Sequence, residues 1–292
     1  MKQVCVFAIL SLIIGACVGT SANAASDANV KQAAKTCGSR NTNHNVRVRA
    51  CSKAIESGQY SGRSIVALFI NRGGGNFSIG ELDRAIEDFT RAVANYESTP
   101  RLNNMFATAF MQRGIAFREI RQMDRAIKDL DLAVRLRPNF AKAFFHRGII
   151  YLKKKSQLDL AIRDFNQAIH LKPDYIGAYN GRAQTYFEKG FLDKAIEDYT
   201  EAIRLMPENF NFLIGRGNAY SRDYKFGLAI KDYEAAIRLN PNSPMAFFNR
   251  GLTYESNGKT ALAIMDFRKA YSLGFRNPLF IDKLRKYDAL PQ

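Results

Sequence analysis

The chain is organised around a motif that recurs at a nearly fixed spacing. Asn-Arg-Gly, or a close variant, appears six times, and an aspartate follows each arginine by sixteen or seventeen residues. The pairs are Arg72 with Asp88, Arg113 with Asp129, Arg147 with Asp164, Arg182 with Asp198, Arg216 with Asp232, and Arg250 with Asp266. From the second pair on, the arginines are 34, 35, 34 and 34 residues apart. Such a period predicts an all-α fold of stacked helical hairpins, which offers a binding surface and no enclosed reaction pocket.

Within each period, apolar and small residues recur at helical spacing. In segment 141–175 they are Phe144, Gly148 and Tyr151 on a first helix and Ala161, Phe165 and Ala168 on a second, followed by Pro173. The corresponding residues elsewhere are Phe69, Gly73, Ala85, Phe89 and Ala92; Phe110, Gly114, Phe117, Ala126, Leu130, Ala133 and Pro138; Tyr179, Ala183, Tyr186, Ala195, Tyr199, Ala202 and Pro207; Leu213, Gly217, Tyr220, Ala229, Tyr233, Ala236 and Pro241; and Phe247, Gly251, Tyr254, Ala263, Phe267 and Ala270. The small residues allow two helices to approach closely, and each hairpin must stack on its neighbours to bury its apolar face.

This pattern resembles that of the tetratricopeptide repeat family, over six copies that span about residues 66–277. It departs from the family's commonest form because arginine replaces the usual leucine before the small residue. In the first copy, Gly74 and Gly75 are expected to disturb the first helix. The resemblance implies antiparallel helix pairs wound into a right-handed superhelix, with a concave groove lined by the first helix of each pair.

The arginine and aspartate of each copy occupy facing positions of one hairpin. We interpret them as six bidentate structural ion pairs that fix the register of the two helices. The alternative is a stripe of arginines that binds anions. The matched aspartates argue against it, because the arginine charges are already neutralised.

The first 24 residues have the features of a secretory signal peptide. Lys2 precedes an apolar run that is too short to span a bilayer, and residues 22–24 form an A-x-A cleavage site. We therefore expect an exported, periplasmic protein. In an alternative interpretation, Ile14 to Cys17 resembles a lipobox, and Cys17 becomes lipidated and tethers the protein to a membrane.

Residues 25–65 are predicted to cap the first repeat with helices over 31–36 and 45–57. Cys37 and Cys51 are the two cysteines that remain after signal cleavage, and in an exported chain such a pair predicts a disulfide. His44 lies between them in sequence, but three ligands without a fourth make a poor zinc site, so we expect no metal.

Residues 278–292 are predicted to form a C-terminal capping helix. The stretch from Pro278 to Asp288 is amphipathic, with apolar residues at Leu279, Ile281, Leu284 and Tyr287. Two irregularities interrupt the period. Residues 97–104 lengthen the spacing between the first two arginines to 41, which predicts a surface loop, and 153–155 form a basic turn of three lysines.

The formal net charge is +16, from 43 lysines and arginines against 27 aspartates and glutamates. This charge favours anionic partners such as lipids, cell-wall polymers or acidic proteins, although it also simply promotes solubility. Nucleic acid is not expected as a partner, because the basic residues are spread through the repeats of an exported chain.

In the resembled family, partners lie along the groove and contact defined positions of each first helix. Transferred position by position, the groove residues are Arg118, Lys142, Phe145, Ile149, Lys153, Asn180, Gln184, Phe187, Asn211, Ile214, Asn218, Arg222, Met245 and Phe248. Amides, apolar side chains and cations of this kind suit an extended peptide. The Lys and Asn pair of the chaperone-binding carboxylate clamp is absent, and several of these residues could instead pack against adjacent repeats.

The sequence contains no phosphate loop, no H-E-x-x-H, no nucleophile elbow and no free catalytic cysteine once the disulfide is assigned. We therefore expect a protein that is not an enzyme and needs no cofactor. The function that we predict is a periplasmic scaffold that binds a peptide or protein partner. The alternative is a peripheral envelope protein that contacts anionic lipid or cell-wall polymer, and self-association through the terminal repeat would leave the groove free.

Overall fold

A computed structural model describes residues 26–39, 41–94, 96–97 and 99–287, and the predicted signal peptide lies outside this part. Within the described residues the regular structure is helical, without a β-strand, which confirms the all-α fold. The contacts divide the chain into two compact units. The first unit ends at Asn139, and the second unit begins at Phe140. This boundary falls inside the predicted block of repeats.

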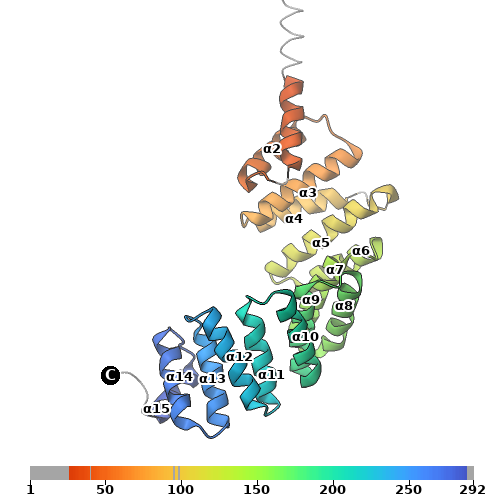
Figure 1. Ribbon diagram of the computed structural model, residues 1–292. Helices are drawn as coiled ribbons and strands as arrows, with labels where there is room; N and C mark the ends of the chain where they lie inside the picture. The colour runs from red at the N-terminus through yellow and green to blue at the C-terminus, as the bar shows by residue number, and fades with distance from the viewer. Residues whose placement is uncertain (1–25, 40, 95, 98, 288–292) are drawn as a thin grey trace, which may run out of the picture. The chain divides into compact units, whose positions relative to one another are not determined.

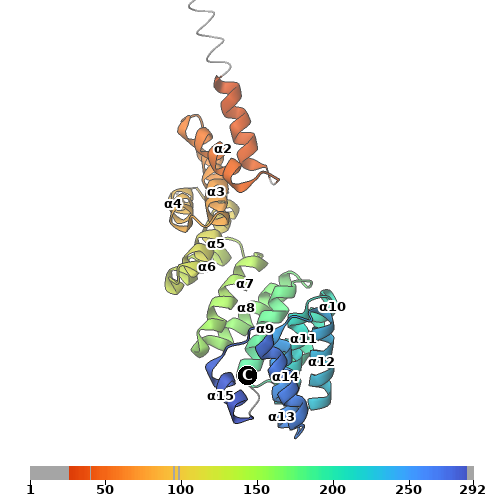
Figure 2. The ribbon, with the colours of Figure 1, turned by 90° about the vertical axis from the view of Figure 1, so that its left-hand side faces the viewer.

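The first unit begins with a helix over residues 26–38. It continues with α2 (His44–Glu56), α3 (Gly62–Ser78), α4 (Leu82–Val93), the short 3-10 helix η1 (Pro100–Leu102), α5 (Asn103–Glu119) and α6 (Met123–Leu136), as Figure 1 shows. The helices α3 with α4 and α5 with α6 form the two hairpins, α2 packs on α3, and α4 packs on α5. Figure 2 shows the helix over residues 26–38 beside α2, to which the Cys37–Cys51 bond joins it.

The helix α3 runs without interruption from Gly62 to Ser78, so the expectation that Gly74 and Gly75 disturb it is wrong. Its glycines allow close approach of neighbouring side chains. A Cβ atom at Gly73 would lie 2.7 Å from the ring of Phe89, and one at Gly75 would lie 2.8 Å from a methyl group of Val48. The segment expected as a surface loop over residues 97–104 contains η1 and the start of α5.

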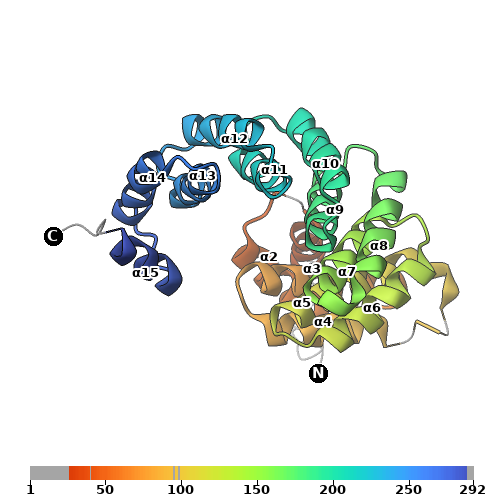
Figure 3. The same cartoon turned by 90° about the horizontal axis from the view of Figure 1, so that it is seen from below.

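The second unit contains four helix pairs and a terminal helix. These are α7 (Ala141–Lys153), α8 (Leu158–Leu171), α9 (Ile176–Lys189), α10 (Leu192–Leu205), α11 (Phe210–Arg222), α12 (Phe226–Leu239), α13 (Pro244–Ser256), α14 (Thr260–Ser272) and α15 (Pro278–Lys286), with the 3-10 helix η2 (Lys155–Gln157) between α7 and α8. Figure 3 shows α9, α11 and α13 on the inner side of the row and α10, α12 and α14 on its outer side. The first helices of successive pairs in this unit therefore share one face, as the resemblance to the tetratricopeptide repeat family implies.

Small residues of the first helices pack directly against aromatic rings of the second helices. Phe165 of α8 is fully buried between two hairpins. A Cβ atom on Gly148 of α7 would lie 2.9 Å from its ring, and a Cβ atom on Gly181 of α9 would lie 2.6 Å from it. Because real Cβ atoms do not come this close, the glycines are what allow successive helices to share one ring.

The helix α15 closes the end of the second unit. Phe280 and Leu284 of this helix are buried and pack with Phe267 of α14. Tyr287 donates a hydrogen bond to Glu255, whereas the side chain of Leu279 lies outside the described part of the structure. The helix buries the apolar face that the last hairpin would otherwise expose.

Candidate partner-binding cleft

A cleft of about 790 Å³ lies across the first helices α7, α9 and α11 of the second unit. Eight of the fourteen predicted groove residues line it, namely Ile149, Lys153, Asn180, Gln184, Phe187, Asn211, Ile214 and Asn218. Seven further residues complete the lining, namely Leu152, Lys155, Glu188, Tyr199, Asn209, Phe212 and Gly215. The helix spacing that the sequence predicts thus brings together residues from three consecutive repeats.

Amide side chains provide most of the polar groups in the cleft. The side-chain oxygen of Asn218 accepts hydrogen bonds from the hydroxyl of Tyr233 at 2.8 Å and from Asn249 Nδ2 at 2.9 Å. These bonds orient its Nδ2 as a donor. Asn180 accepts a long hydrogen bond of 3.4 Å from Gln184, whose side chain is exposed. The cleft can therefore both donate hydrogen bonds to a peptide backbone and accept them from it.

Apolar side chains form the walls of the cleft. Ile214 and Phe212 are each 7% exposed and contribute only their edges. Phe187 is half-buried, and the guanidinium of Arg222 lies 5.1 Å from its ring centroid while donating a 2.8 Å hydrogen bond to its carbonyl oxygen. Arg222 is thus held against the cleft wall, so that Phe187 has a fixed position from which to contact an apolar side chain.

The charged residues of the cleft come from α7, η2 and α9. Lys153 is exposed, and Lys155 Nζ lies 3.8 Å from a carboxylate oxygen of Glu188. These three lining residues carry two positive charges against one negative charge. An acidic side chain of a ligand is therefore favoured near Lys153.

Tyr199 and Gly215 are two of the seven lining residues that sequence reasoning missed. Tyr199 occupies the position of α10 that normally holds a core aromatic residue, and its side chain is only 5% exposed. A Cβ atom on Gly215 of α11 would lie 2.5 Å from its ring and 2.9 Å from its hydroxyl oxygen. The missing side chain at Gly215 lets the tyrosine reach the cleft. The sequence signal for this access is Gly215 itself, because the equivalent position one repeat later holds Asn249.

The other predicted groove residues have different surroundings. Lys142 and Met245 are exposed without lining the cleft. Phe145 packs on Tyr175 at a centroid distance of 4.9 Å, and Phe248 packs on Phe275 at 4.6 Å. Arg118, in the first unit, forms a 2.6 Å ion pair with the adjacent Glu119. For Phe145 and Phe248, packing between neighbouring elements is the role that the structure shows.

All six arginine and aspartate pairs meet in the structure, with Nε and Nη2 of each arginine directed at the aspartate carboxylate. The Nη2 to Oδ1 distances are 2.7 Å for Arg72–Asp88, 2.8 Å for Arg113–Asp129, 2.7 Å for Arg147–Asp164, 2.6 Å for Arg182–Asp198, 2.8 Å for Arg216–Asp232 and 2.8 Å for Arg250–Asp266. The aspartate side chains are 3% to 9% exposed. Hydrogen bonding to Asp232 raises the pKa of Arg216, so this guanidinium keeps its positive charge. The carboxylate of Asp232 already balances that charge.

Several of these arginines also bond the preceding hairpin or capping helix through their third nitrogen. Nη1 donates from Arg72 to Ser52, from Arg113 to Thr90, from Arg182 to Asn166 and from Arg216 to Thr200, at 3.1, 3.1, 2.6 and 3.1 Å. The pairs therefore fix the register within a hairpin and also between consecutive elements of the stack. The sequence indicated only the first of these two roles.

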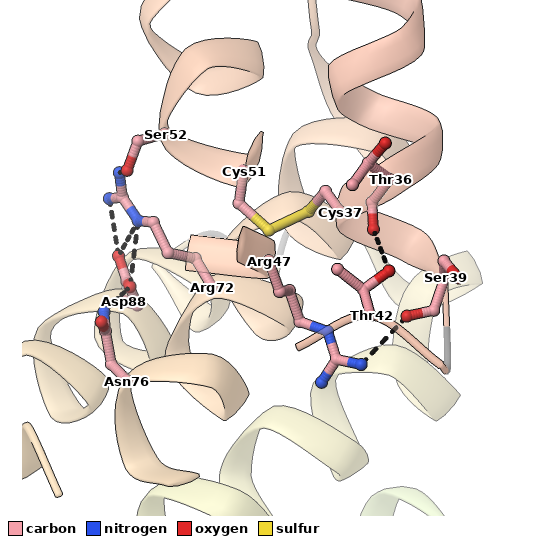
Figure 4. Close-up of a disulfide and its surroundings, with 10 residues drawn as sticks. All are labelled: Thr36, Cys37, Ser39, Thr42, Arg47, Cys51, Ser52, Arg72, Asn76 and Asp88. Carbon is pink, nitrogen blue, oxygen red and sulfur yellow. Dashed lines mark hydrogen bonds and ion pairs between the residues drawn. A yellow bond between two sulfur atoms is a disulfide. The ribbon is translucent and has the colours of Figure 1, made fainter. Parts of the chain in front are cut away.

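Figure 4 shows the cysteine pair and the first of the ion pairs. The Sγ atoms of Cys37 and Cys51 are bonded at 2.11 Å, and both residues are buried. Arg47 of α2 donates a 3.0 Å hydrogen bond to the carbonyl oxygen of Ser39, so a polar contact supports the same junction. His44 begins α2 and is exposed, and within the described residues no group of His, Cys, Asp and Glu side chains could hold a metal ion.

Family models match the repeats that the geometry defines. A model described as TPR repeat matches residues 152–190, 183–223 and 225–258. Models described as tetratricopeptide repeat match residues 76–139 and 246–273. Because these matches together cover more than half of the chain, the chain belongs to the tetratricopeptide repeat family. Proteins of this family are generally non-catalytic scaffolds for protein–protein interaction.

Solved structures with the same fold include the following three. A tetratricopeptide repeat protein from Parabacteroides merdae is 20% identical, with 83% of this chain and 91% of that chain covered and a TM-score of 0.59. YrrB, described as a TPR protein with an unusual peptide-binding site, is 18% identical, with 68% and 99% covered and a TM-score of 0.56. MamA is 24% identical, with 60% and 97% covered and a TM-score of 0.51. A comparison with curated proteins finds no match.

Proposed function

We propose that this protein is an exported, non-catalytic scaffold that binds an extended peptide segment of a partner protein in the cleft across α7, α9 and α11. The observation that carries this proposal is the convergence of donors, apolar walls and an excess of positive charge within one cleft of about 790 Å³. A volume of this size accommodates a short stretch of extended chain. The amides contact its backbone, Phe187 and Ile149 contact an apolar side chain, and Lys153 attracts an acidic one.

Export is the second part of the proposal. The proposal of export rests on the signal-like segment 1–24. Export would place the chain in an oxidising compartment, in which the Cys37–Cys51 bond forms and persists. We expect a mature chain that begins at Ala25 in the periplasm. Within the described residues, no helix is both long enough and apolar enough to cross a bilayer. Mass spectrometry of the protein recovered from the periplasm measures the cleavage site, and a Cys17→Ser variant with unchanged fractionation argues against a lipid anchor.

A peptide library tests the binding function directly. Gln184 is exposed on the cleft wall, so Gln184→Trp fills the cleft without disturbing the core. We expect the wild type to select peptides with an acidic residue next to an apolar one and Gln184→Trp to lose them. Lys153→Glu should remove the acidic preference, whereas Lys142→Glu, at an exposed site on the same helix that does not line the cleft, should keep it.

Salt dependence separates this function from adsorption to an anionic surface. Apolar and hydrogen-bonded contacts in the cleft resist screening, whereas contacts between dispersed surface charges do not. Peptide binding should therefore survive 0.5 M salt with only a few-fold loss. Binding to anionic vesicles that is equal in wild type and Gln184→Trp and lost in salt, without any peptide binding, supports the peripheral envelope function and contradicts ours.

A further inference from the structure

Tyr199 and Tyr233 occupy the same position in consecutive repeats, 34 residues apart. Among the described residues, only the hydroxyl of Tyr233 has a hydrogen-bond partner. Tyr233 is 1% exposed, and its hydroxyl donates to Asn218 at 2.8 Å. Tyr199 is 5% exposed, and its hydroxyl forms no hydrogen bond within the described part of the chain. The hydroxyl oxygen is not fully buried, because it is absent from the enclosed polar atoms without a partner and its residue lines the cleft. It is therefore open to water in the free protein and can donate to an acceptor that enters the cleft.

The packing of the core does not require a hydroxyl at this position. The corresponding residues of other repeats include Phe89, Phe165 and Phe267, each of them fully buried. A phenylalanine at position 199 would fill the same space without leaving a polar atom unpaired. The hydroxyl of Tyr199 therefore contributes something other than packing.

Gly215 gives this hydroxyl its access to the cleft. In the next repeat the same position holds Asn249, which donates to Asn218 and thereby closes the polar network around Tyr233. At Gly215 there is no side chain to do so, and any Cβ atom would collide with the ring of Tyr199 at 2.5 Å. Tyr199 and Gly215 both line the cleft, so the unpaired hydroxyl faces the space in which a ligand would lie.

We propose that the Tyr199 hydroxyl is the specificity-determining donor of the cleft and that it donates a hydrogen bond to a backbone carbonyl oxygen of an extended peptide. This inference rests on the peptide-binding function proposed above. A neutral carbonyl suits the position better than a carboxylate, because Glu188 lines the same cleft and its negative charge would repel a second anion there. Burial and the charge of Glu188 both raise the pKa of Tyr199, so the hydroxyl keeps its proton and remains a donor at neutral pH.

The test compares Tyr199→Phe with Tyr233→Phe, since the two changes remove the same atom from equivalent positions. The probe is the tightest peptide that the wild type selects from a library of random linear dodecapeptides, resynthesised with a fluorophore and titrated by anisotropy. We expect Tyr199→Phe to weaken binding about 5- to 15-fold and Tyr233→Phe to weaken it less than about 2-fold. Because Tyr199→Phe removes only an unpaired hydroxyl, its melting temperature should not fall.

A second measurement identifies the acceptor. Replacing single amides of the peptide by esters weakens one carbonyl acceptor and removes one N–H donor at a time, and one such ester should cost more affinity in the wild type than in Tyr199→Phe. If instead an Asp or Glu side chain of the peptide shows this coupling, the assignment to a backbone carbonyl is overturned.

The outcomes separate the inference from the function on which it rests. Equal affinities of Tyr199→Phe and wild type, together with loss of binding in Gln184→Trp, would overturn the role of Tyr199 and leave the cleft as the binding site. Failure of the wild type to select any peptide, or binding that Gln184→Trp leaves unchanged, would overturn the proposed function itself and the inference with it.

Discussion

Arg182 donates two parallel hydrogen bonds to Asp198, from Nε at 2.7 Å and from Nη2 at 2.6 Å. The two side chains come from α9 and α10 and are 20% and 7% exposed. Burial raises the pKa of Asp198 despite the hydrogen bonds from Arg182. The folded state therefore disfavours the charged carboxylate relative to water, and the pair specifies helix register more than it adds stability.

The first prediction concerns this pair. Arg182→Leu leaves an unpaired buried carboxylate, and Asp198→Leu leaves an unpaired arginine, so each single change should lower the free energy of unfolding by about 2–4 kcal/mol. The double change leaves no buried charge at this position and should lower it by only about 0–2 kcal/mol. Urea denaturation of the four proteins measures the coupling. Additive losses in the double variant would contradict the role that we assign to the pair.

The second prediction concerns the glycines that receive an aromatic ring. A Cβ atom on Gly251 of α13 would lie 2.6 Å from the ring of Phe267 and 3.3 Å from the carbonyl oxygen of Ala263. Gly251→Ala should therefore force α13 and α14 apart and lower stability by about 1–3 kcal/mol. Thermal denaturation measures this loss of stability, and the melting temperature of Gly251→Ala should fall by several degrees.

Gly227 provides the matched control for this substitution. It lies in α12, and a Cβ atom there would have no neighbour within 4 Å. Gly227→Ala should raise stability by roughly 0.3–1 kcal/mol, because alanine restricts the unfolded chain. Similar losses in both variants would mean that close packing is not the reason for glycine at Gly251.

The period of the arginines was sufficient to predict the hairpins, the small residues between them and the aspartate that faces each arginine. The resemblance to the tetratricopeptide repeat family also predicted eight lining residues of the cleft, because the first helices of the second unit present equivalent positions to one face. Contacts that depend on residues outside the repeating positions were not predictable. Phe145 packs on Tyr175 from a turn, and Phe248 packs on Phe275 from the C-terminal segment.

Tyr199 shows a different limit of sequence reasoning. The repeat pattern assigns Tyr199 to the core, and the residue is buried, with 5% of its surface exposed. That its hydroxyl reaches the cleft depends on the absence of a side chain at Gly215, on the next hairpin. Similarly, the hydrogen bond from Arg72 to Ser52 joins the first repeat to the capping helix, and neither residue alone indicates it.

The third prediction concerns the bond between Cys37 and Cys51, which closes a loop with a sequence separation of 14. Replacing both cysteines by alanine should lower stability by about 2–4 kcal/mol, because the unfolded chain gains conformational freedom. The loss should be concentrated near α2, so hydrogen exchange should increase over residues 26–56. Ser52 follows Cys51 and accepts from Arg72, so α3 should be affected next.

Reduced wild-type protein is the control, since it keeps both side chains and lacks only the bond. It should show the same local increase in exchange. The helices α9 to α14 of the second unit should keep their protection. A uniform increase over both units would show that the bond stabilises more than the N-terminal cap.

The fourth prediction concerns stability at alkaline pH. The ordinary pKa of a tyrosine is about 10, and burial raises the pKa of both Tyr199 and Tyr233 above this value. Above about pH 10 the unfolded chain therefore loses protons that the folded chain still holds. Since the unfolded state then binds fewer protons, the free energy of unfolding should fall as the pH rises, by up to about 1.4 kcal/mol per pH unit for each tyrosine.

Lysines also titrate in this range, so the comparison between variants decides the origin of the loss. Tyr199→Phe and Tyr233→Phe should each make the decline between pH 9.5 and 11 less steep, as measured by urea denaturation at each pH. Tyr224→Phe is the control, because a side chain that is 82% exposed changes its surroundings little on unfolding. If all three variants follow the wild-type curve, the buried phenols do not control alkaline unfolding. If only Tyr233→Phe differs, the cleft hydrates Tyr199 enough to remove its share.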